Sequence, residues 1–269
     1  MLALTVTGLQ FLMLPKTEIN SLKNPSIIIS EDGFTYCNLK TYSFIKIDNV
    51  ELSKGNSFKN WINKNCIDNS TQLIVANKPG LFFPKAIFDQ KMINEYYEKF
   101  DFIDESDTLK TDVSANYINS IIYKASSSIQ SLRKVYLINS SLIHYQTLIY
   151  DFLVLKNKNN SEKKLYVNIQ NDAFDVFLFF GEQLQLVNRF PIKGPESFLY
   201  FLYFIIEKNE LKENEFFICF LGNYLFYEEY YKGAMLFHNK IEFVLANSEN
   251  HSSSTPFLID LHANYFRNS

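Results

Sequence analysis

The chain contains 269 residues, a length that suits one large domain or two lobes of roughly 130 residues each. Hydrophobic residues make up 47% and aromatic residues 16% of the sequence, which supplies enough apolar material for two cores and excludes a disordered chain. The formal net charge is −3, so the basic excess that usually marks a nucleic-acid-binding surface is missing.

Cysteine and histidine are too scattered to indicate a disulfide framework or a metal centre. The cysteines are odd in number and form no CxxC pair, which favours free thiols in a reducing cytoplasm. The histidines show no spacing typical of metal ligands, so we expect no bound metal. The residues concerned are Cys37, Cys66, Cys219, His144, His238, His251 and His262.

Two apolar stretches have simpler explanations than a membrane. Residues 1–14 lack a positively charged start and a small-residue cleavage site, so we interpret them as an edge strand rather than a signal peptide. The longest other apolar run, residues 198–206, is far shorter than the ~20 residues that span a bilayer. We expect a buried helix there and no membrane insertion.

Periodicity in the first half predicts strands first and helices later. Asp32 and Gly33 form a turn between the first two strands, because Asp-Gly pairs readily adopt positive φ. The predicted strands are 26–30, 34–39, 43–50 and 72–76, with a helix at 57–66 before the last of them. Further along we expect a helix at 85–100, a strand within 113–123, a buried strand at 134–138 and a serine-capped helix at 141–150.

The second half repeats the order of the first. Gly181 and Glu182 form a tight turn between two strands, and Gly222 and Asn223 end a buried strand. The predicted elements are strands at 164–169, 174–180, 183–190 and 215–221, with a helix at 196–208.

A repeated meander, helix and strand predicts two similar lobes. We predict an α/β fold in which each lobe has a mixed five-stranded sheet with flanking helices. The polar stretch 156–164 separates the halves, which gives an N-terminal lobe at 1–158 and a C-terminal lobe at 159–269. Residues 101–112 and 247–255 are further polar stretches.

This duplicated plan resembles the actin, heat-shock chaperone and sugar-kinase superfamily, whose lobes are ribonuclease H-like. Residues 165–177 resemble the second phosphate loop of that superfamily, which reads Asp-x-Gly-x-x-Thr-Thr and is followed by a strand. Within the superfamily the sequence is most similar to the pilus-assembly and secretion branch (PilM-like and GspL-like proteins) and more distantly to FtsA. It also resembles an uncharacterised bacterial family that shares the actin-like plan.

The resemblance departs from the superfamily at the residues that carry its chemistry. Phosphate loops use glycine so that backbone N–H groups can approach the phosphates, and a carboxylate at the strand end positions magnesium. Here Asn168 stands in place of the aspartate and Gln170 in place of the glycine. In the first copy the matching positions fall near Ile28 and Ser30, and Asp32-Gly33 is offset into the turn.

The third motif keeps one glycine, because the superfamily's adenosine-contacting Gly-Gly pair corresponds to Gly222-Asn223. The resemblance therefore implies a degenerate nucleotide cleft. Its candidate residues are Asn168, Gln170, Asn171, Gly222 and Asn223. Two altered phosphate loops argue against hydrolysis, while weak nucleotide binding stays open.

Other groups of residues that resemble catalytic or binding motifs have ordinary structural interpretations. Asp172 and Asp175 could form a carboxylate pair for metal or acid/base work, but we favour Asp172 in a turn and Asp175 facing solvent. The segment 193–197 lacks a phosphate-binding glycine motif and reads as a helix start opened by Gly194. Ser140, Ser141 and His144 suggest no triad, because no GxSxG elbow is present.

Aromatic residues gather in two places. The stripe at 198–204 should lie mostly in the core, with a part left as an exposed patch. The cluster at 224–231 holds aromatic residues beside Glu228 and Glu229, which suits either a protein interface or packing between lobes.

We therefore predict a non-catalytic cytoplasmic binding or assembly scaffold that acts through its cleft or an aromatic surface. We expect a protein partner or self-association, no nucleic acid and no required cofactor, with ATP and magnesium disfavoured. The alternative is a weak ATP-binding protein or phosphotransferase with unorthodox loops. A third possibility is a different small molecule in the cleft.

Overall fold

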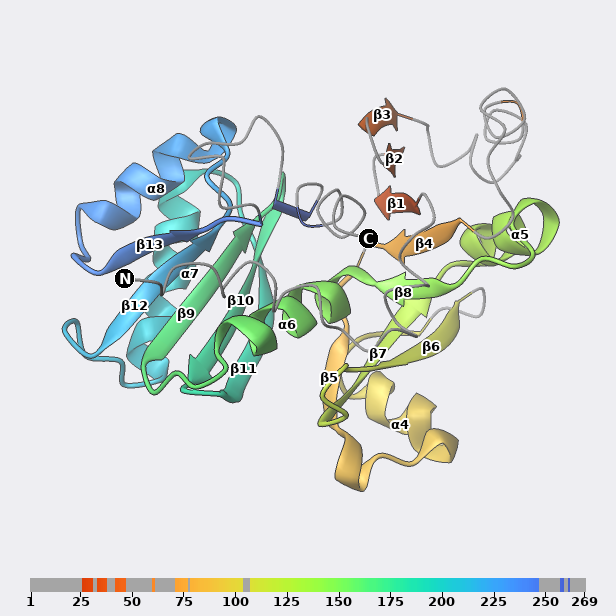
Figure 1. Ribbon diagram of the computed structural model, residues 1–269, viewed down its shortest axis with the longest axis horizontal. Helices are drawn as coiled ribbons and strands as arrows, with labels where there is room; N and C mark the ends of the chain where they lie inside the picture. The colour runs from red at the N-terminus through yellow and green to blue at the C-terminus, as the bar shows by residue number, and fades with distance from the viewer. Residues whose placement is uncertain are drawn as a thin grey trace, which may run out of the picture. The chain divides into compact units, whose positions relative to one another are not determined.

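A computed structural model describes residues 26–30, 33–37, 42–46, 60, 71–76, 78–103, 107–246, 257–258 and 261 (Figure 1). The chain divides into two compact units. Unit 1 comprises Met1–Phe152 with Tyr265–Ser269, and unit 2 comprises Leu153–Asn264. The predicted N-terminal strand, almost all of the helix at 57–66 and the loop at 247–255 lie outside the described residues.

Unit 1 contains a mixed five-stranded sheet in the order β3-β2-β1-β4-β8. The first three strands form an antiparallel meander, and β4 and β8 continue the sheet parallel to β1. The strands are β1 (Ser26–Ser30), β2 (Gly33–Cys37), β3 (Tyr42–Lys46), β4 (Gln72–Val75) and β8 (Leu142–His144). Ile27, Ile29, Phe34, Leu73 and Val75 form part of its buried core.

Unit 2 contains a second five-stranded sheet in the equivalent order β11-β10-β9-β12-β13. Again an antiparallel meander is extended by two parallel strands. The strands are β9 (Lys163–Ile169), β10 (Ala173–Phe180), β11 (Gln183–Pro191), β12 (Phe216–Leu221) and β13 (Ile241–Val244). The matching strand orders confirm the predicted duplication and the mixed five-stranded sheets.

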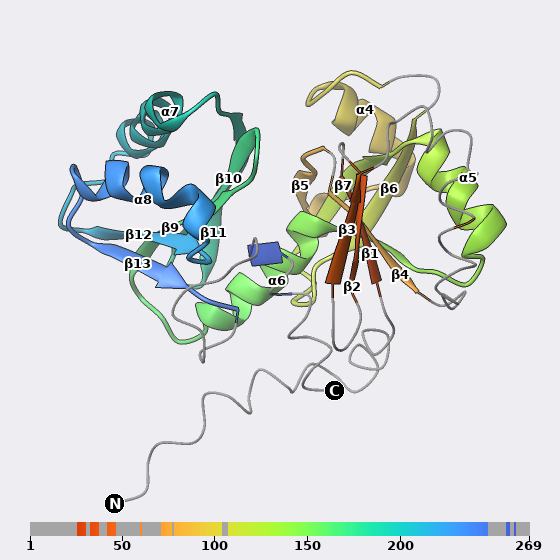
Figure 2. The ribbon, with the colours of Figure 1, turned by 90° about the horizontal axis from the view of Figure 1, so that it is seen from above.

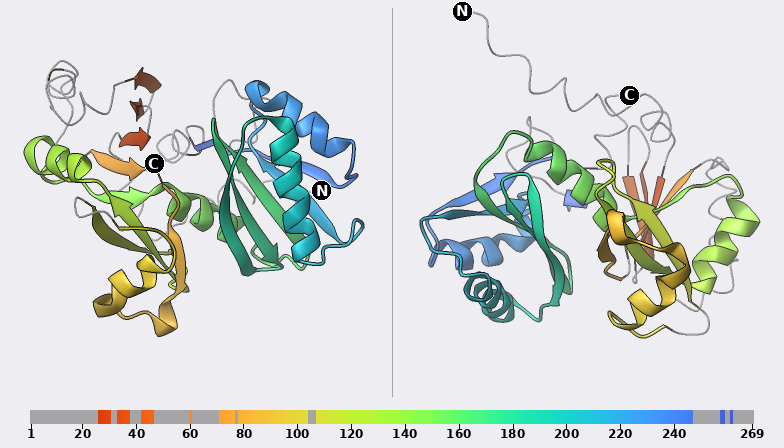
Figure 3. Two further views of the ribbon diagram at one scale, coloured as in Figure 1. Left: turned by 180° about the vertical axis from the view of Figure 1, so that it is seen from behind. Right: turned by 90° about the horizontal axis from the view of Figure 1, so that it is seen from below.

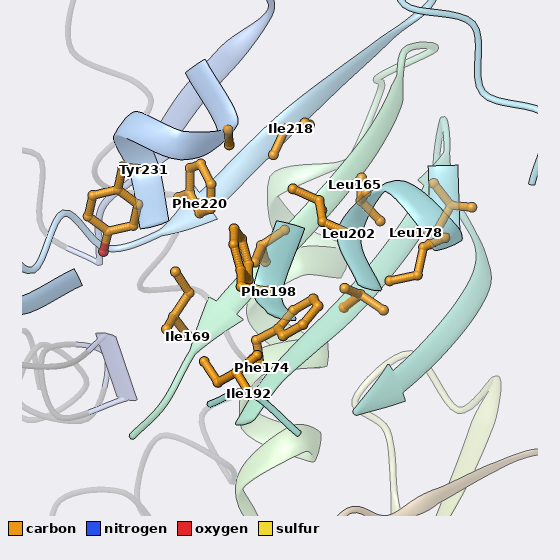
Figure 4. Close-up of a cluster of buried hydrophobic side chains, with 14 of the residues drawn as sticks. Leu165, Ile169, Phe174, Leu178, Ile192, Phe198, Leu202, Ile218, Phe220 and Tyr231 are labelled. Atoms are coloured by element: carbon orange, nitrogen blue, oxygen red, sulfur yellow. The ribbon is translucent and has the colours of Figure 1, made fainter. Parts of the chain in front are cut away.

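Helices α7 (Pro195–Lys208) and α8 (Glu228–Met235) cover one face of the unit 2 sheet (Figures 2 and 3). Gly194 precedes α7 with φ +144, and Pro195 occupies the first helical position, where its missing N–H is not needed. Phe198, Phe174 and Phe220 lie in the core between helices and sheet (Figure 4). The ring of Phe198 meets that of Phe174 edge-on at 4.9 Å.

The opposite face of the unit 2 sheet is also buried. Tyr166 and Phe177 show 2% and 0% exposure. Helix α6 (Tyr145–Lys156) leads into this region, and the Tyr166 hydroxyl donates to Asn157 Oδ1 just after the helix ends. Because both faces are covered, β10 is apolar along nearly its whole length rather than alternating.

Unit 1 has an additional three-stranded antiparallel sheet in the order β5-β7-β6. Its strands are β5 (Leu81–Pro84), β6 (Thr108–Val113) and β7 (Asn119–Ala125), and between β5 and β6 lie η2 (Lys85–Ile87), η3 (Gln90–Met92) and α4 (Ile93–Glu98). In unit 2 the connection from β12 to α8 holds only η4 (Leu225–Tyr227) in its place.

Several predicted boundaries are wrong. The helix expected at 85–100 is α only over Ile93–Glu98, and the strand expected within 113–123 is the β6–β7 hairpin. The strand expected at 134–138 instead belongs mainly to α5 (Ser127–Tyr136), which begins after a Ser126 side-chain cap. The helix expected at 141–150 starts later, because β8 occupies Leu142–His144.

The helices in the described part of the chain all lack the combination of length and apolarity that a membrane crossing requires.

We predict that Phe198→Ala destabilises unit 2 by about 3–5 kcal/mol, because it removes a fully buried ring and leaves a cavity. Tyr200→Ala on the same helix is the matched control, since Tyr200 is 66% exposed, and we expect a cost below about 1 kcal/mol. Urea denaturation followed by circular dichroism measures both. Equal losses in the two variants would contradict this core assignment.

Candidate functional site

The predicted site residues lie at one end of the unit 2 sheet. Strands β9, β12 and β13 are parallel, so their carboxyl ends meet at the same edge, where ligands of α/β sheets usually bind. The residues that the structure places within or directly after β9 and β12 are Asn168, Gln170, Asn171, Gly222 and Asn223.

A buried carboxylate occupies this end of the sheet. Asp175 on β10 lies opposite Asn168 on β9, and its exposure is 0%. The Asn168 Nδ2 group donates to Asp175 Oδ2 at 3.0 Å, and Gln170 Nε2 donates to the same oxygen at 2.8 Å. The expectation that Asp175 faces solvent is therefore wrong, because both faces of β10 are covered. Asp172 lies exposed in the turn, as expected.

Arg189 brings a positive charge to this carboxylate. It lies opposite Asp175 in the β10–β11 register, and its side chain is 13% exposed. Its Nη1 donates to Gln170 Oε1 at 2.9 Å and lies 3.6 Å from Asp175 Oδ1. Its Nη2 lies 3.5 Å from Asp172 Oδ1. Side chains from three adjacent strand segments thus bind one another.

The turn after β9 is closed by its own hydrogen bonds. The Gln170 backbone N–H donates to the Ala173 carbonyl at 2.8 Å, so this amide already has an acceptor. Asn171 Oδ1 accepts the Tyr227 hydroxyl at 3.3 Å, which ties the turn to η4. Burial raises the pKa of Tyr227, so its hydroxyl remains a donor across the neutral pH range.

Gly222 is required where the chain leaves β12. Its φ is +81, a conformation that favours glycine, and an added Cβ would lie 3.2 Å from the Phe257 Cβ. Asn223 follows directly and is half-buried. The glycine is thus explained by backbone geometry and by the close approach of Phe257.

The first predicted phosphate loop, at the end of β1, has fewer side chains that could hold a ligand than the loop after β9. Ile28 is buried and Ser30 is half-buried at the end of β1. Asp32 lies outside the described residues. Neither described residue provides a carboxylate or a glycine at this position.

Unit 1 contains a separate polar cluster around Asp112 on β6. Its Oδ2 accepts the His144 backbone N–H at 2.7 Å and the Thr147 hydroxyl at 2.8 Å. Its Oδ1 accepts the Tyr123 hydroxyl at 3.1 Å. Burial raises the Asp112 pKa to about 6, and these hydrogen bonds oppose the shift only in part.

The same cluster fixes the loop that follows β4. His144 is buried, and its Nε2 lies 2.8 Å from the Lys78 carbonyl oxygen, so this nitrogen carries the proton. The Gly80 N–H donates to Gln146 Oε1 at 2.8 Å, and a Cβ on Gly80 would lie 2.7 Å from Ile121. These contacts hold residues 78–80, which follow β4, against β7 and the start of α6.

A family model described as a protein of unknown function, DUF3822, matches residues 16–241. The chain belongs to the DUF3822 family. No curated protein matches it.

Two solved structures show the fold of this DUF3822 protein. A Bacteroides thetaiotaomicron protein with an actin-like ATPase fold and unknown function has a TM-score of 0.73 and 18% identity, covering 94% of this chain and 98% of that one. A structure of the PilM–PilN type IV pilus biogenesis complex has a TM-score of 0.53 and 10% identity, covering 91% of this chain and 98% of that one. The DUF3822 protein therefore has an actin-like fold.

The chemistry available at the unit 2 edge is limited by these internal contacts. Among the described residues of the DUF3822 protein, no group of three or more His, Cys, Asp or Glu side chains converges as a metal site. Asp175 accepts hydrogen bonds from two amides and pairs with a guanidinium. Whether the five predicted residues bind nucleotide stays a prediction.

We predict that Arg189→Met destabilises the DUF3822 protein by about 3–5 kcal/mol, because it leaves the buried Asp175 carboxylate without its cation. Asp172→Asn is the control: Asp172 is 71% exposed, so its loss should cost about 1 kcal/mol or less. Urea unfolding provides both values. The double variant Asp175→Asn/Arg189→Met should recover most of the loss, and a failure to recover would show that packing of Arg189 matters more than its charge.

We predict that Asp112→Asn changes the pH dependence of stability. The folded pKa of about 6 exceeds the ordinary value of 3.8, so the wild type is stabilised by protonation below about pH 4 and loses this contribution as pH rises through 6. Asparagine can keep the contacts to His144 and Thr147 without a charge. The variant should therefore gain on the order of 2 kcal/mol relative to wild type between pH 4 and 7.

Urea unfolding at a series of pH values measures this difference. Glu95→Gln, which changes an exposed carboxylate on α4, is the matched control. If the Asp112→Asn and wild-type curves stay parallel across this range, Asp112 is not the titrating group.

Proposed function

We propose that this DUF3822 protein is a non-catalytic cytoplasmic binding or assembly scaffold built on an actin-like fold. The observation that carries the proposal is the closed network of Asn168, Gln170, Asp175 and Arg189 at the edge where a nucleotide would be held. The cytoplasmic location is part of the proposal, and Cys219, a buried free thiol whose pKa is raised by burial, is held in the protonated and less reactive form.

Phosphate binding needs backbone N–H groups that are open to the ligand and an available carboxylate for magnesium. At this edge the Gln170 N–H is bonded to Ala173, and the Gln170 side chain is bonded to both Asp175 and Arg189. Rearranging these groups around a triphosphate would break one buried and two partly buried side-chain hydrogen bonds, each worth about 1 kcal/mol. These costs favour a scaffold over a nucleotide hydrolase.

A protein partner agrees with the complex of PilM with PilN, in which a protein of this fold is found with another protein. For the DUF3822 protein, binding through a surface would leave the closed network intact. The partner would therefore be a protein or a second copy, and neither nucleic acid nor a bilayer core is needed.

Weak ATP binding or phosphotransfer is the alternative. The observation in its favour is Gly222, which keeps a positive φ at the position of the superfamily's adenosine-contacting glycines. Gly222 is also explained by its approach to Phe257, so this observation supports the alternative less strongly than the network supports the scaffold.

We predict that magnesium-ATP at 5 mM shifts the melting temperature by less than about 1 °C and that no magnesium-dependent phosphate release occurs. A ligand present at 100 times its Kd stabilises the folded state by about 2.7 kcal/mol, which corresponds to several degrees. Asn223→Asp is the matched control, because a carboxylate added at this edge would repel a triphosphate. A shift of several degrees in the wild type that disappears in Asn223→Asp would favour the alternative.

A further inference from the structure

Strand β11 is an outer strand of the unit 2 sheet, and within the described residues it pairs with β10 alone. It is nine residues long, whereas the outer strands β3, β5, β8 and β13 have five residues or fewer. The six-residue outer strand β6 carries Lys110 and Asp112. Proteins use short edge strands and charged side chains to prevent unwanted strand pairing. β11 is therefore the long edge strand among those described.

The charged residue of β11, Arg189, is paired within its own unit. Its guanidinium donates to Gln170 and lies 3.6 Å from Asp175, so it does not protect the edge as an outward lysine would. The bulge in the β10–β11 pairing lies toward the turn, and residues 186–191 keep a regular register with β10. This part of β11 thus presents a regular backbone edge whose charge is already balanced.

One hydrogen bond shows which backbone groups of β11 point away from β10. The Arg189 N–H donates to the Asn188 side-chain oxygen at 2.8 Å, although Arg189 lies directly opposite Asp175 of β10. Its N–H and C=O groups therefore point outward, and the alternation of an antiparallel ladder gives Val187 the same direction. Two residues with outward backbone groups thus lie on either side of Asn188, which is exposed.

Partly exposed aromatic residues lie beside this edge. Phe201 of α7 meets Phe190 of β11 with 5.3 Å between ring centroids, so α7 runs along the β11 side of the sheet. Both rings are half-buried. Phe204 follows Phe201 on the same side of the helix and is 41% exposed. The backbone edge is therefore continuous with an apolar surface that a further strand and helix would cover.

We propose that β11 pairs antiparallel with β11 of a second copy of this chain, with Asn188 on the twofold axis, a step that rests on the proposed scaffold function. In this register Val187 of one copy lies opposite Arg189 of the other, and each such pair can exchange two backbone hydrogen bonds. Both strands are already extended, so little backbone entropy is lost on pairing. The two sheets then join into one, and the α7 helices lie on the same face beside the axis.

The chemistry of the edge favours a second copy over a different protein. A twofold contact requires a surface that is complementary to itself. The outward groups of Val187 and Arg189 are placed symmetrically about Asn188, so each donor meets an acceptor of the other copy. Like charges do not meet, because Arg189 lies opposite Val187 and stays beside Asp175. A different partner would be selected by a charge pattern, which this edge lacks.

Light scattering on the purified full chain tests the pairing. We expect a particle of twice the chain mass of 31.5 kDa. Asn188→Lys would bring two ammonium groups together at the axis, so the Kd of the dimer should rise at least about tenfold. Asn239→Lys is the matched control, because it makes the same exchange at an exposed position just before β13, at the opposite edge of the sheet. A monomeric wild type, or equal effects of the two substitutions, would overturn the proposal.

Cysteine trapping tests the register itself. A residue on the axis faces its own copy at a distance that a disulfide can span, so Asn188→Cys should form a linked dimer with oxidised glutathione. Asn239→Cys should not form one. Equal linking of the two variants, or none, would contradict the register. The magnesium-ATP test concerns the ends of β9 and β12, so a monomer would overturn the pairing of β11 and leave the result on the closed network standing.

Discussion

The buried carboxylate of Asp175 is the constraint on which the unit 2 edge depends. A fully buried carboxylate is costly unless hydrogen bonds and an opposite charge surround it. Asn168, Gln170 and Arg189 meet this need from β9, the following turn and β11. Each of them is then unavailable for a ligand. The contacts from which we propose that this edge does not hold a nucleotide are thus the same contacts that make burial of Asp175 tolerable.

The duplicated topology decides where this constraint acts. In both units a meander is extended by two parallel strands, so one sheet edge gathers the carboxyl ends of three parallel strands. In unit 2 that edge holds the closed network. In unit 1 the carboxyl end of β1 holds half-buried Ser30, and β8 ends at His144, whose N–H donates to Asp112 Oδ2. Each of these edges therefore has a carboxylate nearby that accepts hydrogen bonds from the protein itself.

The sequence predicted the repeated strand order and the positions of Asn168 and Gln170, because hydrophobic periodicity and turn residues are local signals. Arg189 was missed for a physical reason. Beside the turn of the β10–β11 hairpin, Phe180 pairs with Gln183. If this register continued along the strands, Asn188 would lie opposite Asp175. A bulge between Leu178 and Phe179 shifts the register by one residue, so Arg189 lies there instead. Burial of Asp175 was also missed, since it depends on what covers the second face of the sheet. The strand expected at 134–138 failed because the helix begins earlier, at the Ser126 cap.

Fully buried Asp175 and half-buried Asp112 are both stabilised by hydrogen bonds, but only Asp175 has a cation beside it. Asp112 accepts hydrogen bonds from a backbone amide and two hydroxyls, none of which carries a charge, so burial raises its pKa to about 6. Asp175 has a guanidinium 3.6 Å away and two amide donors. We therefore expect the stability of unit 1 to depend on pH through Asp112, and the stability of unit 2 to depend on Arg189. The charge of Asp175 is thus balanced by a cation of the protein itself, and the proposal of binding through surfaces rests on this internal balance.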